Sequence, residues 1–118
     1  MTASVSVVEV PGGAVVELAG EIDLANADRV RRALVAGATA GELVVDLAGV
    51  TYLDSVGVHL LFEVAATART AGRRLLLALP ADSPVRRLLE VSSVDERMDV
   101  HPSREQAEAA LAGAAGAA

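Results

Sequence analysis

The spacing of hydrophobic residues in the N-terminal part of the chain predicts a β-hairpin. Residues 5–10 (VSVVEV) and 14–19 (AVVELA) are short runs rich in β-branched residues, which is typical of strands. Between them stand Pro11, Gly12 and Gly13, which supply the fixed φ and the positive-φ positions of a turn. We therefore expect two antiparallel strands at the start of the chain.

Beyond Gly20 the pattern changes to the spacing of a helix. Arginines occupy one face, and apolar residues recur at every third or fourth position on the other. These apolar residues are Leu24, Ala27, Val30 and Leu34. Asp23 stands where an N-cap is expected, and Gly37 stands where a helix commonly ends, so a first helix is predicted between them.

A buried strand, a loop and a second helix follow in one continuous stretch. Residues 42–47 (ELVVDL) form a nearly continuous apolar run, which is typical of a central strand covered on both faces. Residues 48–53 are expected to form a loop that leads to Asp54 and Ser55. The second helix is predicted over residues 56–71, with an inward stripe made of Val58, Leu61, Phe62 and Ala65.

The C-terminal half continues the alternation of strands and helices. Residues 74–79 are expected to form another buried strand, and Ser83 before Pro84 indicates the start of a third helix, residues 84–91. Residues 96–100 form a short predicted edge strand.

A capping box at residues 103–106 predicts the start of a last helix. The whole order predicts one α/β domain with a mixed β-sheet, an N-terminal β-hairpin and about four α-helices. We place this domain at residues 1–112 and expect the Gly/Ala tail, residues 113–118, to fray.

Composition narrows the function classes. The chain has 118 residues, 53% hydrophobic content and no cysteine, so a single domain without disulfides or thiolate metal sites is expected. Its net charge of -6 argues against nucleic-acid binding, and no apolar stretch approaches the roughly 20 residues of a membrane span. All ten basic residues are arginine, which excludes Schiff-base and P-loop lysine chemistry. We expect a cytoplasmic protein that binds neither nucleic acid nor membrane.

Ser55, at the predicted start of the second helix, has two possible roles. As an N-cap, its hydroxyl would accept a hydrogen bond from a backbone amide further along the helix. Alternatively, the free amides and positive dipole of a helix start make a site that tolerates a phosphate on Ser55. Asp54 could be the N-cap, a dipole partner, or a charge that shapes the chemistry of Ser55. Asp23 is an N-cap candidate that also ends a predicted strand, on what should be the same side of the sheet as Ser55.

A serine hydrolase is the less favoured alternative. The nucleophile elbow requires Gly-x-Ser-x-Gly, and here Leu53 replaces the first glycine. His59 and His101 are the two imidazole bases, and neither has an identifiable orienting acid in the sequence. No metal-ligand spacing, glycine-rich phosphate loop or paired carboxylates are found, so we expect no catalytic residue, cofactor or metal.

The stretch VVDLAGVTYLDSVGVHLL resembles the signature of STAS domains, in particular the small stand-alone bacterial anti-sigma factor antagonists. Their pattern is a hydrophobic strand, a short loop and Asp-Ser-Ser/Thr-Gly-Leu-Gly at a helix start. The resemblance extends over about residues 5–112, through GEIDLANADRVRRAL and through the C-terminal half that begins at GRRLLLALPADSP.

The resemblance implies a partner-switching role in transcription regulation. The serine that matches Ser55 is phosphorylated by an anti-sigma factor that is a GHKL-type serine kinase, and a PP2C-type phosphatase restores it. The unphosphorylated antagonist binds the kinase and so frees the sigma factor. Asp23 and Asp54 match residues that flank the phosphorylation site. The matching helix start implies partner binding by Val56, Gly57, Val58 and His59.

Two departures from the family pattern bear on the partner. Val56 replaces the second Ser/Thr, and His59 replaces the final glycine, so the helix face offered to a kinase differs from the common one. One alternative is therefore a STAS module that scaffolds a stress-signalling assembly or binds a small ligand without phosphorylation at Ser55. The cognate kinase, the sigma factor, the stimulus and the oligomeric state are not specified by the sequence.

Overall fold

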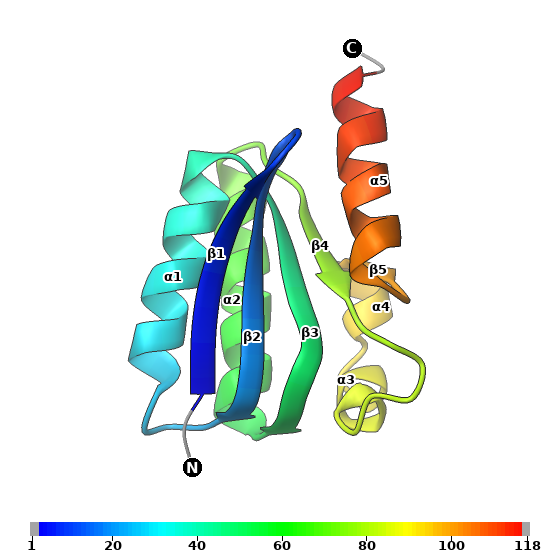
Figure 1. Cartoon of the computed structure of the whole chain (residues 1–118). Helices are drawn as coiled ribbons and strands as arrows, with labels where there is room; N and C mark the ends of the chain where they lie inside the picture. Colours follow the sequence, from blue (N-terminus) through cyan, green and yellow to red (C-terminus); the bar gives the residue numbers. More distant parts are fainter. Residues whose placement is uncertain (1–2, 117–118) are drawn as a thin grey trace.

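The computed structural model describes the backbone of residues 3–116 and the side chains of residues 3–113. A five-stranded sheet has the strand order β1-β2-β3-β4-β5, with β1 antiparallel to β2 and the other neighbours parallel (Figure 1). The strands are β1 (Ala3–Val10), β2 (Gly13–Ile22), β3 (Glu42–Leu53), β4 (Leu75–Ala78) and β5 (Asp99–His101). The helices are α1 (Ala27–Ala40), α2 (Ser55–Thr70), α3 (Arg86–Val91), α4 (Val94–Arg97) and α5 (Arg104–Gly116). The predicted α/β domain with a mixed sheet is confirmed, and α4 is an additional short helix.

The sheet has an apolar core on each face. Helices α1 and α2 cover one face, and α5 packs against the other, on β3, β4 and β5 (Figure 1). Buried residues alternate between the faces along β2, because successive side chains of a strand point to opposite sides. Val16 and Leu18 join the core under α1 and α2, whereas Val15 joins Leu111 of α5 on the other face.

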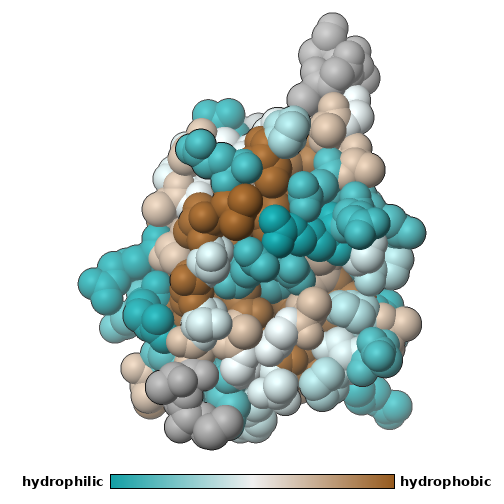
Figure 2. All heavy atoms as spheres, viewed as in Figure 1, coloured by the Kyte–Doolittle hydropathy of each residue, from teal (hydrophilic) through white to brown (hydrophobic). Residues whose placement is uncertain are grey.

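The N-terminal hairpin forms as predicted and is longer than the sequence pattern suggested. Val10 pairs with Gly13, so the turn consists of Pro11 and Gly12, and Gly12 has a φ of 92°. Strand β1 is an edge of the sheet. Figure 2 shows hydrophobic residues gathered over the part of this face where β1 lies. Within β1, the side chain of Val7 is 58% exposed.

The predicted bounds of the first helix were wrong at both ends. Strand β2 continues to Ile22, so Asp23 lies in a turn, and Asn26 occupies the position before the first residue of α1. The helix passes through Gly37 and ends at Ala40. Leu24, which was assigned to the inward stripe, precedes the helix and is 77% exposed. The local helical pattern is overridden because the end of β2 pairs with β3.

The predicted loop over residues 48–53 is a strand. Strand β3 is 12 residues long, and its pairing with β2 shifts register twice. The first shift lies between Glu17 and Ala19 of β2, and the second lies between Gly20 and Glu21. Each shift places an extra residue in β3, which is the property of a β-bulge. The bulges break the alternation of buried and exposed residues, which is why the sequence pattern resembled a loop.

The C-terminal half follows the predicted order with shifted boundaries. Helix α3 begins at Arg86, because the Ser83 hydroxyl accepts a hydrogen bond from the Val85 amide at 3.2 Å and forms a turn first. The predicted strand over residues 96–100 is shorter, at Asp99–His101, because residues 94–97 form α4.

Half of the predicted capping box is present at the start of α5. The Ser103 hydroxyl accepts from the Gln106 amide at 3.1 Å. The predicted frayed tail began at residue 113, but α5 continues to Gly116, and residues 117–118 lie outside the described residues. Arg104 joins α5 to β2 through an ion pair with Glu17 at 3.0 Å. None of the helices in the described part has the length and apolar character to cross a membrane.

Candidate functional site

Ser55 is the first residue of α2, and Asp54 is the residue that caps this helix. The Asp54 Oδ1 atom accepts a hydrogen bond from the Gly57 amide at 3.1 Å, and the Asp54 carbonyl accepts from the Val58 amide at 3.0 Å. The proposed N-cap role of Ser55 was therefore wrong, and that of Asp54 is confirmed. Ser55 is exposed, and its hydroxyl makes no hydrogen bond with any residue that the structure describes.

The ends of β2 and β3 hold this helix start in place. Ile22 pairs with Leu53, and the Ile22 carbonyl accepts from the Asp54 amide at 3.4 Å. Gly57 allows the first turn of α2 to lie directly against these strands. A Cβ atom on Gly57 would lie 2.3 Å from Cδ1 of Leu53 and 3.4 Å from Cγ2 of Ile22. The position of Ser55 is thus fixed by packing that a larger residue would disturb.

The first bulge of β3 is supported by Asp46. This carboxylate is only 9% exposed, and its Oδ1 atom accepts from the Ala48 amide at 2.9 Å. Next to it, a Cβ atom on Gly49 would lie 2.9 Å from the Cβ atom of Ala19 on β2. Bulges redirect the strand that follows them and are common beside functional sites. Asp46 and Gly49 therefore help to set where β3 delivers Asp54 and Ser55.

Asp23 lies at the same end of the sheet as Ser55. It directly follows Ile22, as Asp54 directly follows Leu53, and these two apolar residues pair across β2 and β3. The Asp23 carboxylate accepts from the Ala25 amide at 3.0 Å and is half-buried. The strand register thus places both predicted flanking residues at the end of the sheet where α2 begins. The ends of β2 and β3 and the start of α2 lie together at the bottom of Figure 1.

The four residues predicted to bind a partner differ in exposure. Gly57 and Val58 are buried, with Val58 8% exposed, whereas Val56 is half-buried and His59 is exposed. The accessible surface of this turn therefore belongs to Ser55, His59 and part of Val56. Partner binding by all four residues stays a prediction, with Gly57 and Val58 acting through the position of the helix.

The two histidines do not form a catalytic arrangement with Ser55 in the described residues. His59 follows on the same helix and makes no hydrogen bond to Ser55. His101 lies on β5 at the level of Asp46, in the middle of β3, and its Nε2 atom is 3.2 Å from the Asp99 carboxylate.

Sequence reasoning missed two large apolar side chains beside the site. Leu24, in the turn after β2, is 77% exposed, and Tyr52, near the end of β3, is 50% exposed. The register between β2 and β3 would have revealed the exposure of these two side chains. That register could not be inferred while residues 48–53 were interpreted as a loop.

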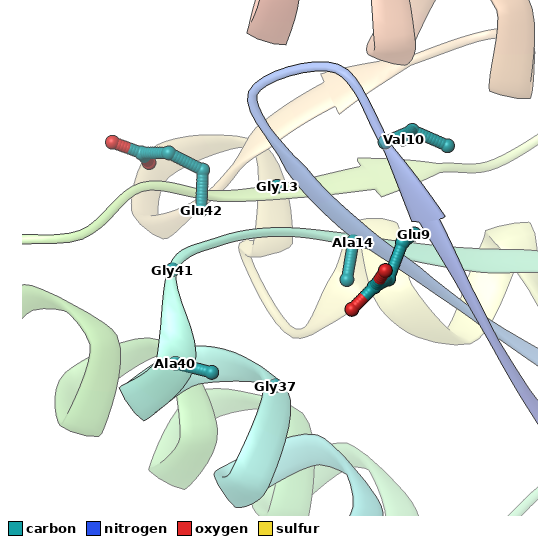
Figure 3. Close-up of a pocket in the computed structure, with 8 residues that line it drawn as sticks. All are labelled: Glu9, Val10, Gly13, Ala14, Gly37, Ala40, Gly41 and Glu42. Atoms are coloured by element: carbon teal, nitrogen blue, oxygen red, sulfur yellow. The ribbon is translucent and has the colours of Figure 1, made fainter.

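A cavity of about 250 Å³ lies at the opposite end of the sheet, between the hairpin turn and the end of α1 (Figure 3). Glu9 and Glu42 are its two titratable residues, and the rest of the lining is apolar or small. The lining offers no nucleophile, and the cavity is smaller than most ligand pockets. This cavity therefore has no part in the chemistry of Ser55.

Comparison with known proteins agrees with the fold. The family model described as STAS domain matches residues 4–107. An anti-sigma factor antagonist from Mycobacterium paratuberculosis is 28% identical, with a TM-score of 0.75 over 93% of this chain and 94% of that chain.

Two structures of the anti-sigma factor antagonist SpoIIAA have the same fold. The unphosphorylated form is 20% identical, with a TM-score of 0.75 over 93% of this chain and 97% of that chain. The phosphorylated form, from Bacillus, is 19% identical, with a TM-score of 0.63 over 88% of this chain and 96% of that chain.

Proposed function

The chain belongs to the STAS domain family, and we propose that it is an anti-sigma factor antagonist switched off by phosphorylation at Ser55. One observation carries the proposal: Ser55 is an exposed residue at the start of α2 whose hydroxyl is not used to cap the helix. Asp54 performs the capping instead. A modification of the Ser55 hydroxyl therefore leaves the cap of α2 intact.

The helix start is compatible with a phosphate. A phosphoserine carries about -1.5 to -2 charges at neutral pH. Negative charge at a helix N-terminus is favoured by the free backbone amides and by the helix dipole. The phosphorylated chain keeps its fold, and the change is confined to the surface charge around Ser55.

This change in charge explains how phosphorylation releases a partner. The phosphate adds to the carboxylates of Asp23 and Asp54, which lie at the same end of the sheet. When a partner covers Ser55, the phosphate loses its water of hydration. Like charges placed next to one another in an interface cost several kcal/mol. Since about 1.4 kcal/mol corresponds to a tenfold change in affinity, this cost is sufficient to switch off binding.

The partners follow from this mechanism. The unphosphorylated chain binds a cytoplasmic anti-sigma factor, a GHKL-type serine kinase, and so frees the sigma factor for transcription. The kinase transfers the ATP γ-phosphate to Ser55, and a PP2C-type phosphatase hydrolyses the phosphoserine. The chain itself is a substrate and ligand and catalyses no step. Val56 and His59 distinguish the face that the cognate kinase recognises.

Incubation of the chain with purified anti-sigma factor kinases and ATP tests the proposal. Intact-mass and peptide mass spectrometry should find one phosphate on Ser55 with the cognate kinase. Ser55→Ala should abolish labelling, and Thr51→Ala, which removes another exposed hydroxyl nearby, should leave it unchanged. Labelling at another residue, or none with a kinase that binds the chain, contradicts the proposal.

The alternative is a STAS scaffold that is not phosphorylated, and the departures at Val56 and His59 favour it. In that case the chain purifies from its cells as part of a large assembly. Replacement of Ser55 by Ala then leaves both the assembly and its signalling unchanged.

A further inference from the structure

Two exposed apolar side chains belong to segments at the end of the sheet where α2 begins. In the described residues, four large hydrophobic side chains are exposed: Val7, Leu24, Tyr52 and Val91. Leu24 is 77% exposed and Tyr52 is 50% exposed, and these two belong to segments that meet at the start of α2. Single exposed apolar residues are common on protein surfaces, but two of them near one candidate site suggest a binding surface.

The strand register brings these residues to one end of the sheet. Tyr52 pairs with Glu21 across β3 and β2, and the following residues, Leu53 and Ile22, also pair. Leu24 lies two residues after Ile22, in the turn before α1. Leu53 and Ile22 point into the core under α1 and α2, so Tyr52 points to the opposite face by strand alternation. Leu24 and Tyr52 therefore both belong to segments at the end of the sheet where α2 begins.

The two segments that carry these residues have charged side chains of one sign only. Segments 21–24 (EIDL) and 52–55 (YLDS) contain three carboxylates, those of Glu21, Asp23 and Asp54, and no basic residue. The whole chain has a net charge of -6. A surface of this kind is complementary to apolar pockets surrounded by arginine or lysine, and it repels a second copy of itself. The occupant is accordingly a different protein with a basic surface.

We propose that Leu24 and Tyr52, hereafter the apolar pair, are the anchors by which the anti-sigma factor kinase holds this chain around Ser55. The inference rests on the proposed function and extends it, because it assigns the main apolar contacts to the β2–α1 turn and the end of β3 rather than to α2. Tyrosine is enriched among residues that dominate binding energy, since its large ring is ordered at small entropic cost. Val58, by contrast, is buried in this chain and has little surface left to offer.

The location of the apolar pair also accounts for control by Ser55. Asp54 and Ser55 follow Leu53 directly, at the same end of the sheet as Leu24, so a partner that contacts both anchors also approaches the Ser55 hydroxyl. The carboxylates of Asp23 and Asp54 then face the basic rim of the partner. A phosphate on Ser55 has to be accommodated inside this rim, next to the Asp54 carboxylate and the apolar anchors, where it loses water and is repelled by a like charge.

Calorimetric titration with the purified kinase that labels Ser55 tests the inference. Leu24→Ala and Tyr52→Ala should each weaken binding by roughly tenfold or more. The matched controls are Val7→Ala and Val91→Ala, which truncate exposed apolar side chains on other parts of the surface. Val7 is 58% exposed and Val91 is 66% exposed. These controls should change affinity by no more than about twofold. Circular dichroism and thermal melting should show all four variants folded, because each replaced side chain is exposed.

The outcomes separate this inference from the proposed function. If Ser55→Glu weakens kinase binding but Leu24→Ala and Tyr52→Ala do not, the apolar pair is overturned and the phosphorylation switch stands. If the controls weaken binding as much as the two variants, the pair is likewise overturned. Loss of self-association on sedimentation, with kinase binding unchanged, assigns the surface to a second copy instead. If no anti-sigma factor kinase binds the wild-type chain, both the proposed function and the inference fail.

Discussion

The carboxylate of Asp54 accepts a hydrogen bond from the amide of Gly57 at 3.1 Å, and this contact leaves the neighbouring Ser55 free of any capping role. Two adjacent residues that are each suited to cap a helix thus have different tasks. Asp54 satisfies a backbone donor that has no partner within the helix. Ser55, as the first helical residue, presents its hydroxyl to the surface.

Replacement of the cap should affect stability, whereas replacement of the serine should not. We expect Asp54→Ala to lower the free energy of unfolding by about 1 kcal/mol. Asp54→Asn, which keeps an oxygen acceptor, should cost less, and Ser55→Ala should stay within about 0.5 kcal/mol of wild type. Urea denaturation of the three variants provides the measurement. An equal loss for Ser55→Ala and Asp54→Ala would show that the serine also supports the helix start.

The contact between Gly57 and Leu53 predicts a second stability effect. In Gly57→Ala the new Cβ atom lies 2.3 Å from Cδ1 of Leu53 unless the helix or the leucine moves, so we expect a loss of about 1–3 kcal/mol. Gly113→Ala is the matched control, since a Cβ atom on Gly113 meets nothing within 4 Å.

The control should show the ordinary gain from glycine to alanine in a helix, roughly 0.5–1 kcal/mol. In addition, Leu53→Ala should recover part of the loss when combined with Gly57→Ala, because it removes the overlapping atoms. A double-mutant cycle with no coupling would refute this account of the packing.

The chain should not hydrolyse esters. Ser55 has no hydrogen bond to His59, and His101 lies at the level of Asp46 on another strand, so no base activates the hydroxyl. We expect release of nitrophenol from simple aryl esters to equal the rate in buffer, with no difference between wild type and Ser55→Ala. Turnover that disappears in Ser55→Ala but persists in Asp54→Asn would instead identify Ser55 as a nucleophile.

The sequence located the start of α2 at Asp54 and Ser55 because the signals there are local. An apolar strand, a cap and an apolar helical stripe each depend on a few neighbouring residues. The hairpin was equally accessible, since Pro11 and Gly12 determine the turn through their own φ preferences.

The rest of the site depends on pairing between distant segments. The end of β3 was predicted as a loop, because two bulges place Leu47, Val50 and Leu53 in one core at intervals of three residues, a spacing that strand alternation does not produce. Without that strand, the extension of β2 to Ile22 could not be inferred, and Leu24 was assigned to the wrong element. The exposure of Leu24 and Tyr52 follows from this long-range register, which the local pattern does not encode.

The measurement that tests the central claim most directly is a calorimetric comparison of phosphorylated and unphosphorylated chain, titrated with the kinase that modifies Ser55. We expect the phosphorylated chain to bind at least about tenfold more weakly, since a charge in an unfavourable position within an interface costs several kcal/mol. Its thermal transition should stay close to that of the unphosphorylated chain, because Asp54 still caps α2. Equal affinity of the two forms would contradict the proposal that phosphorylation of Ser55 switches the partner.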